Sequence, residues 1–436
     1  MAESPELFVR GGRIVDETGT RAGNVHVRDG VIVGVGEHLA APAGALVLDA
    51  EGCVVSPGLV DIQVHFREPG REESETIESG SRGAALGGFT AVVAMPNTTP
   101  PLDDAKVVGA LLEQGRRAMC HVTVAGCITK GRAGHELAPL GELYDLGVRV
   151  FTDDGDCVAD ANVMRRAFEY ALALPDAVIS QHAEDPALVA GGHMHEGEWS
   201  AKLGIPGRPA AAESTIVARD IELARLTGGR YHVLHMSTAE ATAHVRAAKA
   251  AGVRVTAEAS PQHFTLTDAA CASFDPVFKM NPPLRSDADV EAITEGLVDG
   301  TIDAIATDHA PHAPETKERP FEEAPPGMLG VETALAVAIT RLVSTGRAPL
   351  EHVIGALSWR PARIGGLFDL GHGHPVAVGN PANLCVFDPA EQWVVDPDRV
   401  ASRSRNTPFA GWKLTGKVRH TVLRGEPVVI DKEPQR

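Results

Sequence analysis

PGLVDIQVHFREPG, residues 57–70, predicts a short buried strand that ends on polar side chains. Its largely apolar run extends from Leu59 to Val64, and His65 follows directly. Successive side chains of a strand point to opposite faces, so Gln63 and His65 share one face. A short run of this kind is typical of a strand in a parallel sheet, covered on both sides. We therefore predict a buried strand that carries polar groups at its C-terminal end.

Seven more short apolar runs follow before residue 370, with helix-like segments between them, for example at 76–86 and 215–226. They end near Asn97, Cys127, Asp154, His182, His235, Glu258 and Asp308. Alternating strands and helices favour a parallel sheet, and eight such units over roughly 250 residues fit a (β/α)8 TIM-type barrel. An open doubly wound sheet is the alternative fold, but no GxGxxG motif follows the first strand.

The two ends of the chain have a different pattern. Residues 7–56 contain short strand-like runs, and Asp29-Gly30 between two of them is a strong hairpin signal. Residues 384–387, 418–423 and 428–430 are also strand-like, with a turn at Arg424-Gly425. We therefore predict one small β-sandwich domain that combines residues 1–56 and 371–436. The barrel domain would occupy residues 57–370.

The composition argues against several classes of protein. The chain has 436 residues and a formal net charge of −18, which disfavours binding to nucleic acid or to an anionic membrane. No apolar stretch approaches the roughly 20 residues that a membrane span needs. Residues 1–6 lack the apolar segment of a secretory signal, and the 6 cysteines include no CxxC pair. We expect a cytoplasmic protein without a disulfide framework.

Metal-capable side chains stand at the ends of several predicted strands. They are His65, Asp154, His182, His235 and Asp308. The C-terminal ends of barrel strands meet at one mouth, where the catalytic groups of TIM barrels lie. Histidine and carboxylate ligands suit Zn²⁺ or a similar divalent ion. A single histidine at a strand end is usually structural, but this combination of residues predicts a metal site.

Several motifs resemble those of bacterial class I dihydroorotases, which belong to the amidohydrolase superfamily. The resemblance covers nearly the whole chain and rests on residues 56–61, 65–70, 94–98, 151–155, 182–185, 279–285, 305–312 and 406–409. It implies a metal-dependent hydrolase that interconverts L-dihydroorotate and N-carbamoyl-L-aspartate in de novo pyrimidine (UMP) biosynthesis. It also implies a homodimer, with aspartate transcarbamoylase as a further candidate partner.

The resemblance implies roles for individual residues as well. His65 and Asp308 would hold one zinc ion, His182 and His235 would hold a second, and Asp154 would bridge the two. Hydantoinases usually place a carboxylated lysine at the bridge, whereas the matching strand here offers no lysine. Asp308 would also act as general acid and base. The substrate would contact His65, Arg67, Asn97, Asn281, His312, Pro326 and Gly327. Apart from the resemblance, residues 310–330 are irregular, rich in Pro and Glu and follow the last strand, which predicts an active-site loop.

Gln63 departs from the family pattern, which has His-x-His where this chain has Gln63-Val64-His65. An amide oxygen is a weaker zinc ligand than an imidazole nitrogen. We therefore expect the first metal position to be weakened, emptied or suited to a harder ion. Two alternatives stay open. One is another cyclic-amide hydrolase of the superfamily, and the other is a catalytically silent dihydroorotase-like subunit that binds aspartate transcarbamoylase.

Overall fold

Eight parallel strands form a closed barrel in the middle of the chain. The computed structural model describes residues 6–436. The barrel strands are β8 (Leu59–Val64), β9 (Phe89–Ala94), β10 (His121–Val124), β11 (Val150–Phe151), β12 (Val178–Gln181), β15 (Tyr231–Val233), β16 (Val255–Ala259) and β17 (Ala304–Ile305). They form one sheet of order β10-β9-β8 and another of order β11-β12-β15-β16-β17. Parallel bridges between Gly126 and Phe151 and between Val64 and His309 join the sheets into a ring, so the predicted barrel is confirmed.

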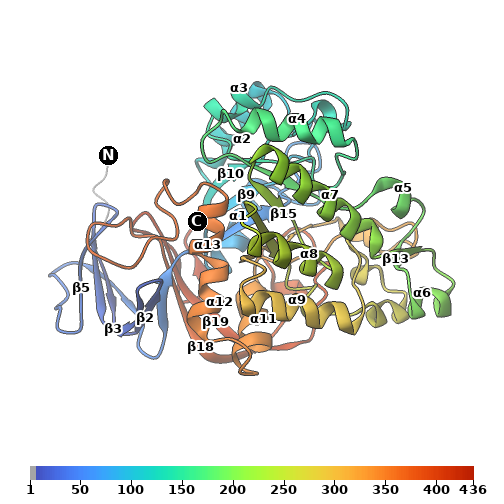
Figure 1. Cartoon of the computed structure of the whole chain (residues 1–436). Helices are drawn as coiled ribbons and strands as arrows, with labels where there is room; N and C mark the ends of the chain where they lie inside the picture. Colours follow the sequence, from blue (N-terminus) through green and yellow to red (C-terminus); the bar gives the residue numbers. More distant parts are fainter. Residues whose placement is uncertain (1–5) are drawn as a thin grey trace.

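Helices surround the barrel (Figure 1). The main ones are α1 (Ile77–Leu86), α2 (Ala105–Gly115), α3 (Leu140–Asp145), α4 (Ala161–Ala171), α7 (Ala211–Thr227), α8 (Ala239–Ala250) and α9 (Asp287–Asp299). The first residues of several of these helices are capped by the side chains that favour this position, such as Thr76 before α1 and Ser286 before α9. Each cap ends a loop that leads from the C-terminal end of a barrel strand, so these loops gather at one mouth.

Shorter elements fill the longer connections. Between β12 and α7 the chain forms α5 (Pro186–Val189), β13 (Met194–His195), α6 (Glu198–Leu203) and β14 (Gly207–Arg208). After β17 it forms α10 (Pro314–Lys317), α11 (Ala334–Ala338), a π-helical turn at 339–343, α12 (Leu350–Leu357) and α13 (Trp359–Ile364). Part of the second connection, within residues 310–327, reaches the barrel mouth.

Strands from both ends of the chain build a β-sandwich, which lies at left in Figure 1. One sheet has the order β5 (Val31–Gly36), β4 (Asn24–Arg28), β1 (Leu7–Arg10) and β6 (Leu46–Asp49). The other has the order β21 (Glu433–Pro434), β20 (Glu426–Ile430), β19 (Lys413–Leu423), β18 (Leu384–Val394), β7 (Val54–Pro57), β2 (Arg13–Asp16) and β3 (Gly19–Ala22). The central strand β7 pairs with β18, about 330 residues away along the chain, as the two-ended prediction requires.

One apolar core holds the two sheets together. It includes Leu7, Ile14, Val27, Leu384 and Val422, each at most 1% exposed. The hairpin expected at Asp29-Gly30 is present between β4 and β5, and both turn residues have positive φ angles of 50° and 77°. The proposed domain boundaries at residues 56 and 371 stay a prediction.

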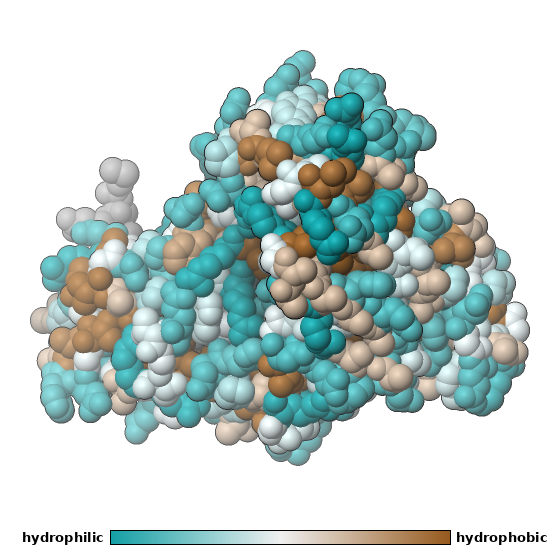
Figure 2. All heavy atoms as spheres, in the orientation of Figure 1, coloured by the Kyte–Doolittle hydropathy of each residue, from teal (hydrophilic) through white to brown (hydrophobic). Residues whose placement is uncertain are grey.

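Three further observations concern the exterior and the cysteines. Figure 2 shows a mostly hydrophilic face with apolar patches on the domain that carries β5. None of the helices within residues 6–436 combines the length and apolarity needed to cross a bilayer. All 6 cysteines are free. The N-terminal stretch on which we judged secretion lies, except for Glu6, outside the described residues.

Candidate active site

The metal-capable side chains named above lie together at the mouth of the barrel. His65 follows β8, Asp154 follows β11, His182 follows β12, His235 follows β15 and Asp308 follows β17. Each is between 1% and 5% exposed. Parallel strands bring these side chains together because their C-terminal ends share one edge of the barrel.

Asp154 stands at the centre of this group. Its carboxylate lies 3.3 Å from His65 Nε2, 3.6 Å from His182 Nδ1 and 3.3 Å from His235 Nε2. The two imidazole nitrogens His182 Nδ1 and His235 Nε2 are only 2.9 Å apart. His65 Nε2 also lies 3.0 Å from Asp308 Oδ1. Three histidines from separate strands therefore converge on one buried carboxylate.

The charges in this group stabilise one another. Burial opposes ionisation of Asp154, yet hydrogen bonds from His182 and His235 hold the pKa of its carboxyl well below the usual value. Burial likewise opposes charge on His182, but hydrogen bonds to Asp154 and Glu184 raise its pKa to about 10. The site therefore keeps a carboxylate ionised in a buried place and favours positive charge beside it.

The donor set fits a divalent ion. Donor atoms of Asp154, His182 and His235 all lie within 4.8 Å of one another, and all three residues are buried. Asp154 Oδ2 and His235 Nδ1 make no hydrogen bond within residues 6–436. Two imidazole nitrogens and a carboxylate oxygen at such short separations form the kind of ligand group that zinc and related ions take. We therefore assign this cluster as the principal candidate for the metal.

Glu184 fixes the orientation of His182. Its Oε2 atom accepts a hydrogen bond from His182 Nε2 at 3.1 Å and a second one from Arg208 Nη1 at 3.0 Å. Because His182 Nε2 donates to this carboxylate, Nδ1 is the atom that faces Asp154 and His235, and it would offer its lone pair to a metal ion once its proton is released. Such carboxylate contacts behind a ligating histidine raise its basicity and set its tautomer.

Replacing Glu184 with glutamine should therefore weaken metal binding about tenfold to a hundredfold. The change removes the negative charge behind His182 and keeps the size of the side chain. Competition with a chromophoric chelator measures the affinity. Glu198→Gln, which alters an exposed glutamate paired with Lys202 on α6, is the matched control. Equal affinities of the two variants would contradict the role given to Glu184.

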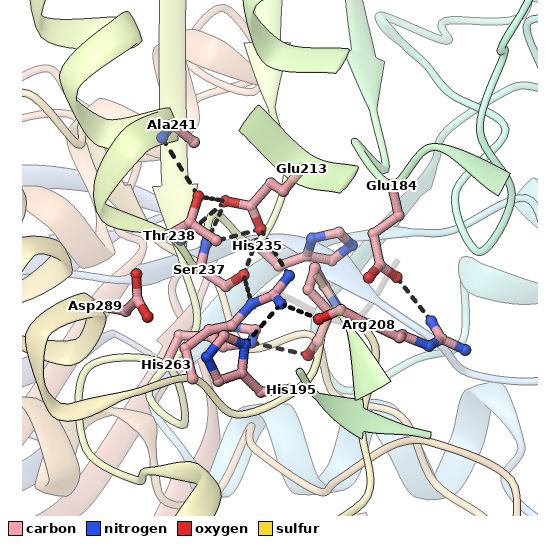
Figure 3. A network of polar contacts seen from close by, with 12 residues as sticks. Glu184, His195, Arg208, Glu213, His235, Ser237, Thr238, Ala241, His263 and Asp289 are labelled. Atoms are coloured by element: carbon pink, nitrogen blue, oxygen red, sulfur yellow. Dashed lines mark hydrogen bonds and ion pairs between the residues drawn. The ribbon is translucent and has the colours of Figure 1, made fainter. Parts of the chain in front are cut away.

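A second carboxylate holds the loop that carries His235. Figure 3 shows Glu213, from α7, pointing at Ser237 and Thr238. It accepts hydrogen bonds from the backbone nitrogens of both residues and from both hydroxyls. The fully buried Arg285 also donates to Ser237 Oγ, at 3.1 Å. These contacts stabilise a loop in which His235 has a φ angle of 29°.

Unusual backbone conformations recur at the site. Arg67, His235 and Asp308 have φ angles of 61°, 29° and 47°, a region that residues other than glycine rarely occupy. Strain of this kind persists where surrounding contacts hold it, and it gathers at functional sites. Arg67, for example, is held by a hydrogen bond from its Nε atom to Pro311 O at 3.0 Å.

A cavity of about 210 Å³ opens beside the metal cluster. It is lined by all the site residues named from the sequence, which are His65, Arg67, Asn97, Asp154, His182, His235, Asn281, Asp308, His312, Pro326 and Gly327. The cavity wall also includes Arg71, Gly155, Ala310 and Pro325, which the sequence analysis did not single out. A pocket of this size suits a small, single-ring molecule better than a polymer.

Several polar residues of the cavity also contact one another. Asn97 Oδ1 accepts from His65 Nδ1 at 2.9 Å, which leaves His65 Nε2 facing the carboxylates. His312 Nε2 donates to Pro326 O at 2.8 Å, and the backbone nitrogen of Gly327 donates to Lys279 O at 2.8 Å. Gly327 has a φ angle of 145°, and a Cβ atom there would lie 2.8 Å from His312 Nε2. Only glycine therefore lets this part of the backbone approach the cavity so closely.

The sequence analysis missed four residues that support the site. Glu184 follows His182 by two residues, and this spacing was the one available signal for it. Glu213 and Arg208 carry no local signal, because their roles depend on contacts with distant loops. Arg71 lies four residues after Arg67 in an acidic stretch, where its charge stands out.

Sequences of dihydroorotases are similar to that of this chain. A family model described as "Dihydro-orotase-like" matches residues 52–241. A dihydroorotase of Streptomyces coelicolor is 47% identical over 429 residues, which cover 98% of this chain and 99% of that protein. A dihydroorotase of Mycobacterium leprae is 46% identical over 96% of this chain and 97% of its own length.

Solved structures resemble the whole fold. An L-hydantoinase (dihydropyrimidinase) from Arthrobacter aurescens superimposes with a TM-score of 0.89 at 26% identity, covering 99% of this chain and 97% of its own. A dihydropyrimidinase from Brevibacillus agri, 23% identical over 99% of this chain and 96% of its own, gives a TM-score of 0.86. The second likeness concerns the fold alone.

Proposed function

The chain belongs to the dihydroorotase family, and on that basis we propose how its site carries out the family's reaction. It is a metal-dependent hydrolase of pyrimidine biosynthesis that interconverts L-dihydroorotate and N-carbamoyl-L-aspartate. The convergence of Asp154, His182 and His235 beside a small cavity is the observation that carries the mechanism. The ion that we propose for this cluster is Zn²⁺, because two imidazoles and a carboxylate are ligands that zinc favours.

When bound, such an ion supplies Lewis acidity, which lowers the pKa of water and draws electron density from a carbonyl. Asp154, His182 and His235 would hold it, and His65 and Asp308 would line a second metal position. The Glu184 carboxylate keeps His182 in the tautomer whose Nδ1 faces the cluster. The protein therefore contributes fixed ligands and a buried, enclosed place for the reaction.

Asp308 is our candidate for proton transfer. In hydrolysis its carboxylate takes a proton from the attacking water and gives it to the ring nitrogen as the C–N amide bond breaks. The reverse steps close the ring of N-carbamoyl-L-aspartate. His65 Nε2, at 3.0 Å from Asp308 Oδ1, orients this carboxylate toward the cavity. Asp308 lies at the mouth of the barrel and lines the cavity, where a substrate could reach it.

Substrate recognition needs positive charge, because dihydroorotate carries a carboxylate while the chain has a net charge of −18. We propose that the Arg67 guanidinium binds this carboxylate through two parallel hydrogen bonds, in bidentate fashion. Asn97, Asn281 and His312 would add hydrogen bonds around the ring, and the backbone of Pro326 and Gly327 would close the far wall. All these residues line the same cavity.

A direct assay tests the function. Purified protein with added Zn²⁺ should consume dihydroorotate. The decrease in the ultraviolet absorbance of dihydroorotate measures this consumption. The reverse reaction should form dihydroorotate from N-carbamoyl-L-aspartate. Absence of turnover in both directions would overturn the proposed mechanism. If the inactive protein also co-purified with aspartate transcarbamoylase, the result would favour the silent-partner alternative.

Gln63 bears on the number of metal ions. Its Nε2 atom donates to Asp154 Oδ1 at 3.2 Å, and its Oε1 atom is buried without a partner in residues 6–436. A neutral amide thus stands where the family pattern has an imidazole. The metal position lined by His65 and Asp308 therefore has one imidazole fewer than the pattern provides. We expect protein purified without chelator to hold fewer than two tightly bound zinc ions per chain, as measured by elemental analysis.

Gln63→His should raise the metal content, because it supplies an imidazole on the same strand face as His65. Gln114→His, which places a histidine on the exposed side of α2, should leave the content unchanged and is the matched control. Two tightly held zinc ions in the parent protein would refute the expectation about Gln63.

The homodimer and the complex with aspartate transcarbamoylase stay proposals, which native mass measurements can test.

A further inference from the structure

A second arginine lines the cavity beside Arg67. Arg71 follows the same barrel strand, β8, and its backbone nitrogen donates to Arg67 O at 3.1 Å. The Nη2 atom of Arg71 donates to Asn97 O at 2.7 Å, which holds the guanidinium next to another residue of the cavity. Its Nε atom is buried and makes no hydrogen bond within residues 6–436. This wall of the cavity therefore contains a fixed guanidinium with an unused donor.

Neither arginine has a carboxylate at ion-pair distance among the described residues, although the charges of Asp308, Asp154 and Glu75 favour the charged form of Arg67. No ion pair within residues 6–436 includes Arg67 or Arg71, whereas nearby Arg132 pairs with Asp156 at 2.5 Å. Burial and then the neighbouring charge of Arg71 lower the pKa of Arg67 to about 9. Two unpaired cations that face one small cavity repel each other unless an anion lies between them. Their placement is therefore expected to favour an anionic ligand.

We propose that Arg71 is a specificity-determining residue, which together with Arg67 binds the carboxylate of the substrate. This inference rests on the proposed function and extends it to a residue outside the set named from the sequence. A carboxylate has about four lone-pair sites, so it can accept hydrogen bonds from two guanidinium groups at once. Arg71 would then act on the carboxylate alone, since the metal cluster and Asp308 act on the ring amide.

The proposal predicts discrimination between two related rings. 5,6-Dihydrouracil has the same cyclic amide as dihydroorotate but lacks the carboxylate. Arg71 should favour dihydroorotate over dihydrouracil without affecting the chemistry of the amide. A loss of Arg71 should therefore reduce the preference for dihydroorotate, and a purely structural disturbance should reduce turnover of both rings equally.

The experiment compares kcat and KM of Arg71→Met and Arg71→Lys with those of the parent enzyme, for both substrates. For Arg71→Met we expect kcat/KM for dihydroorotate to fall about tenfold, mainly through KM, and the value for dihydrouracil to stay within about twofold. Arg71→Lys keeps the charge and loses the planar guanidinium. Its kcat/KM for dihydroorotate should lie between the values of the parent and of Arg71→Met. Arg82→Met, which removes a guanidinium paired with Glu78 on the outer helix α1, is the control and should match the parent.

Several outcomes would overturn the proposal. These are an unchanged KM for dihydroorotate, an equal loss for both substrates, or a loss of bound metal in Arg71→Met. If the parent turns over too little dihydrouracil to measure, the kinetics with dihydroorotate decide. A higher KM with kcat within about twofold supports the proposal, and a lower kcat alone contradicts it. A parent enzyme that does not act on dihydroorotate at all would instead refute the proposed function.

Discussion

Asp308→Asn is expected to lower kcat for dihydroorotate about a thousandfold, because it removes the group that accepts and returns a proton. Asparagine has nearly the same shape but cannot take up the proton of the attacking water. The side chain stands at the barrel mouth, and within residues 6–436 its carboxylate has one hydrogen-bond partner, His65 Nε2 at 3.0 Å. The fold should therefore persist, and the melting temperature should stay close to that of the parent.

Steady-state kinetics in both directions, with metal content and melting temperature measured on the same sample, test this expectation. A loss of activity with the metal still bound would identify proton transfer as the missing step. A loss of metal together with activity would assign Asp308 to ligation instead. Activity within a few-fold of the parent would be incompatible with either role.

Asp154→Asn should abolish metal binding and with it the turnover of dihydroorotate. The substitution removes the one negative charge on which His65, His182 and His235 converge. An amide is a poor zinc ligand, and two imidazoles alone form an incomplete site. We expect activity to fall to the level of the metal-free protein and the metal content to drop to background.

Asp153→Asn provides the matched control, since it changes the neighbouring buried carboxylate. Asp153 is outside the metal cluster and does not line the cavity, and it accepts hydrogen bonds from Ile128 N at 2.8 Å, Thr129 N at 3.0 Å and the Thr129 hydroxyl. Its loss should reduce the free energy of unfolding by about 1–3 kcal/mol and leave the metal bound. If Asp153→Asn lost the metal and Asp154→Asn kept it, the assignment of the two carboxylates would be reversed.

The barrel could be predicted because its information is local. Short apolar runs such as Leu59–Val64 are buried on both sides, and each is followed by a segment with helical character. A capping residue such as Thr76 or Ser286 marks where the helix begins. The first few residues after each strand are then placed at the mouth by the geometry of the barrel, so His65, His182 and Asp308 could be grouped before any contact was known.

The arrangement of the β-sandwich was accessible only in outline. Short strand-like runs and the turns at Asp29-Gly30 and Arg424-Gly425 indicated strands at both ends of the chain. The sequence could not indicate that β7 lies between β18 and β2, antiparallel to one and parallel to the other. Strands that are hundreds of residues apart pair because whole sheets pack together. Local sequence patterns carry no information about which distant strand will be the partner.

By itself the sequence determined the succession of strands and helices along the chain, the barrel and the identity of the metal-capable side chains, because these depend on residue type and on spacing along the chain. Only the tertiary structure decided which atoms face one another. Glu184 behind His182, Glu213 under the His235 loop and Arg71 beside Arg67 are brought into place by separate loops. Hydrogen bonds and charges act over a few ångströms, so their partners follow from the folded geometry.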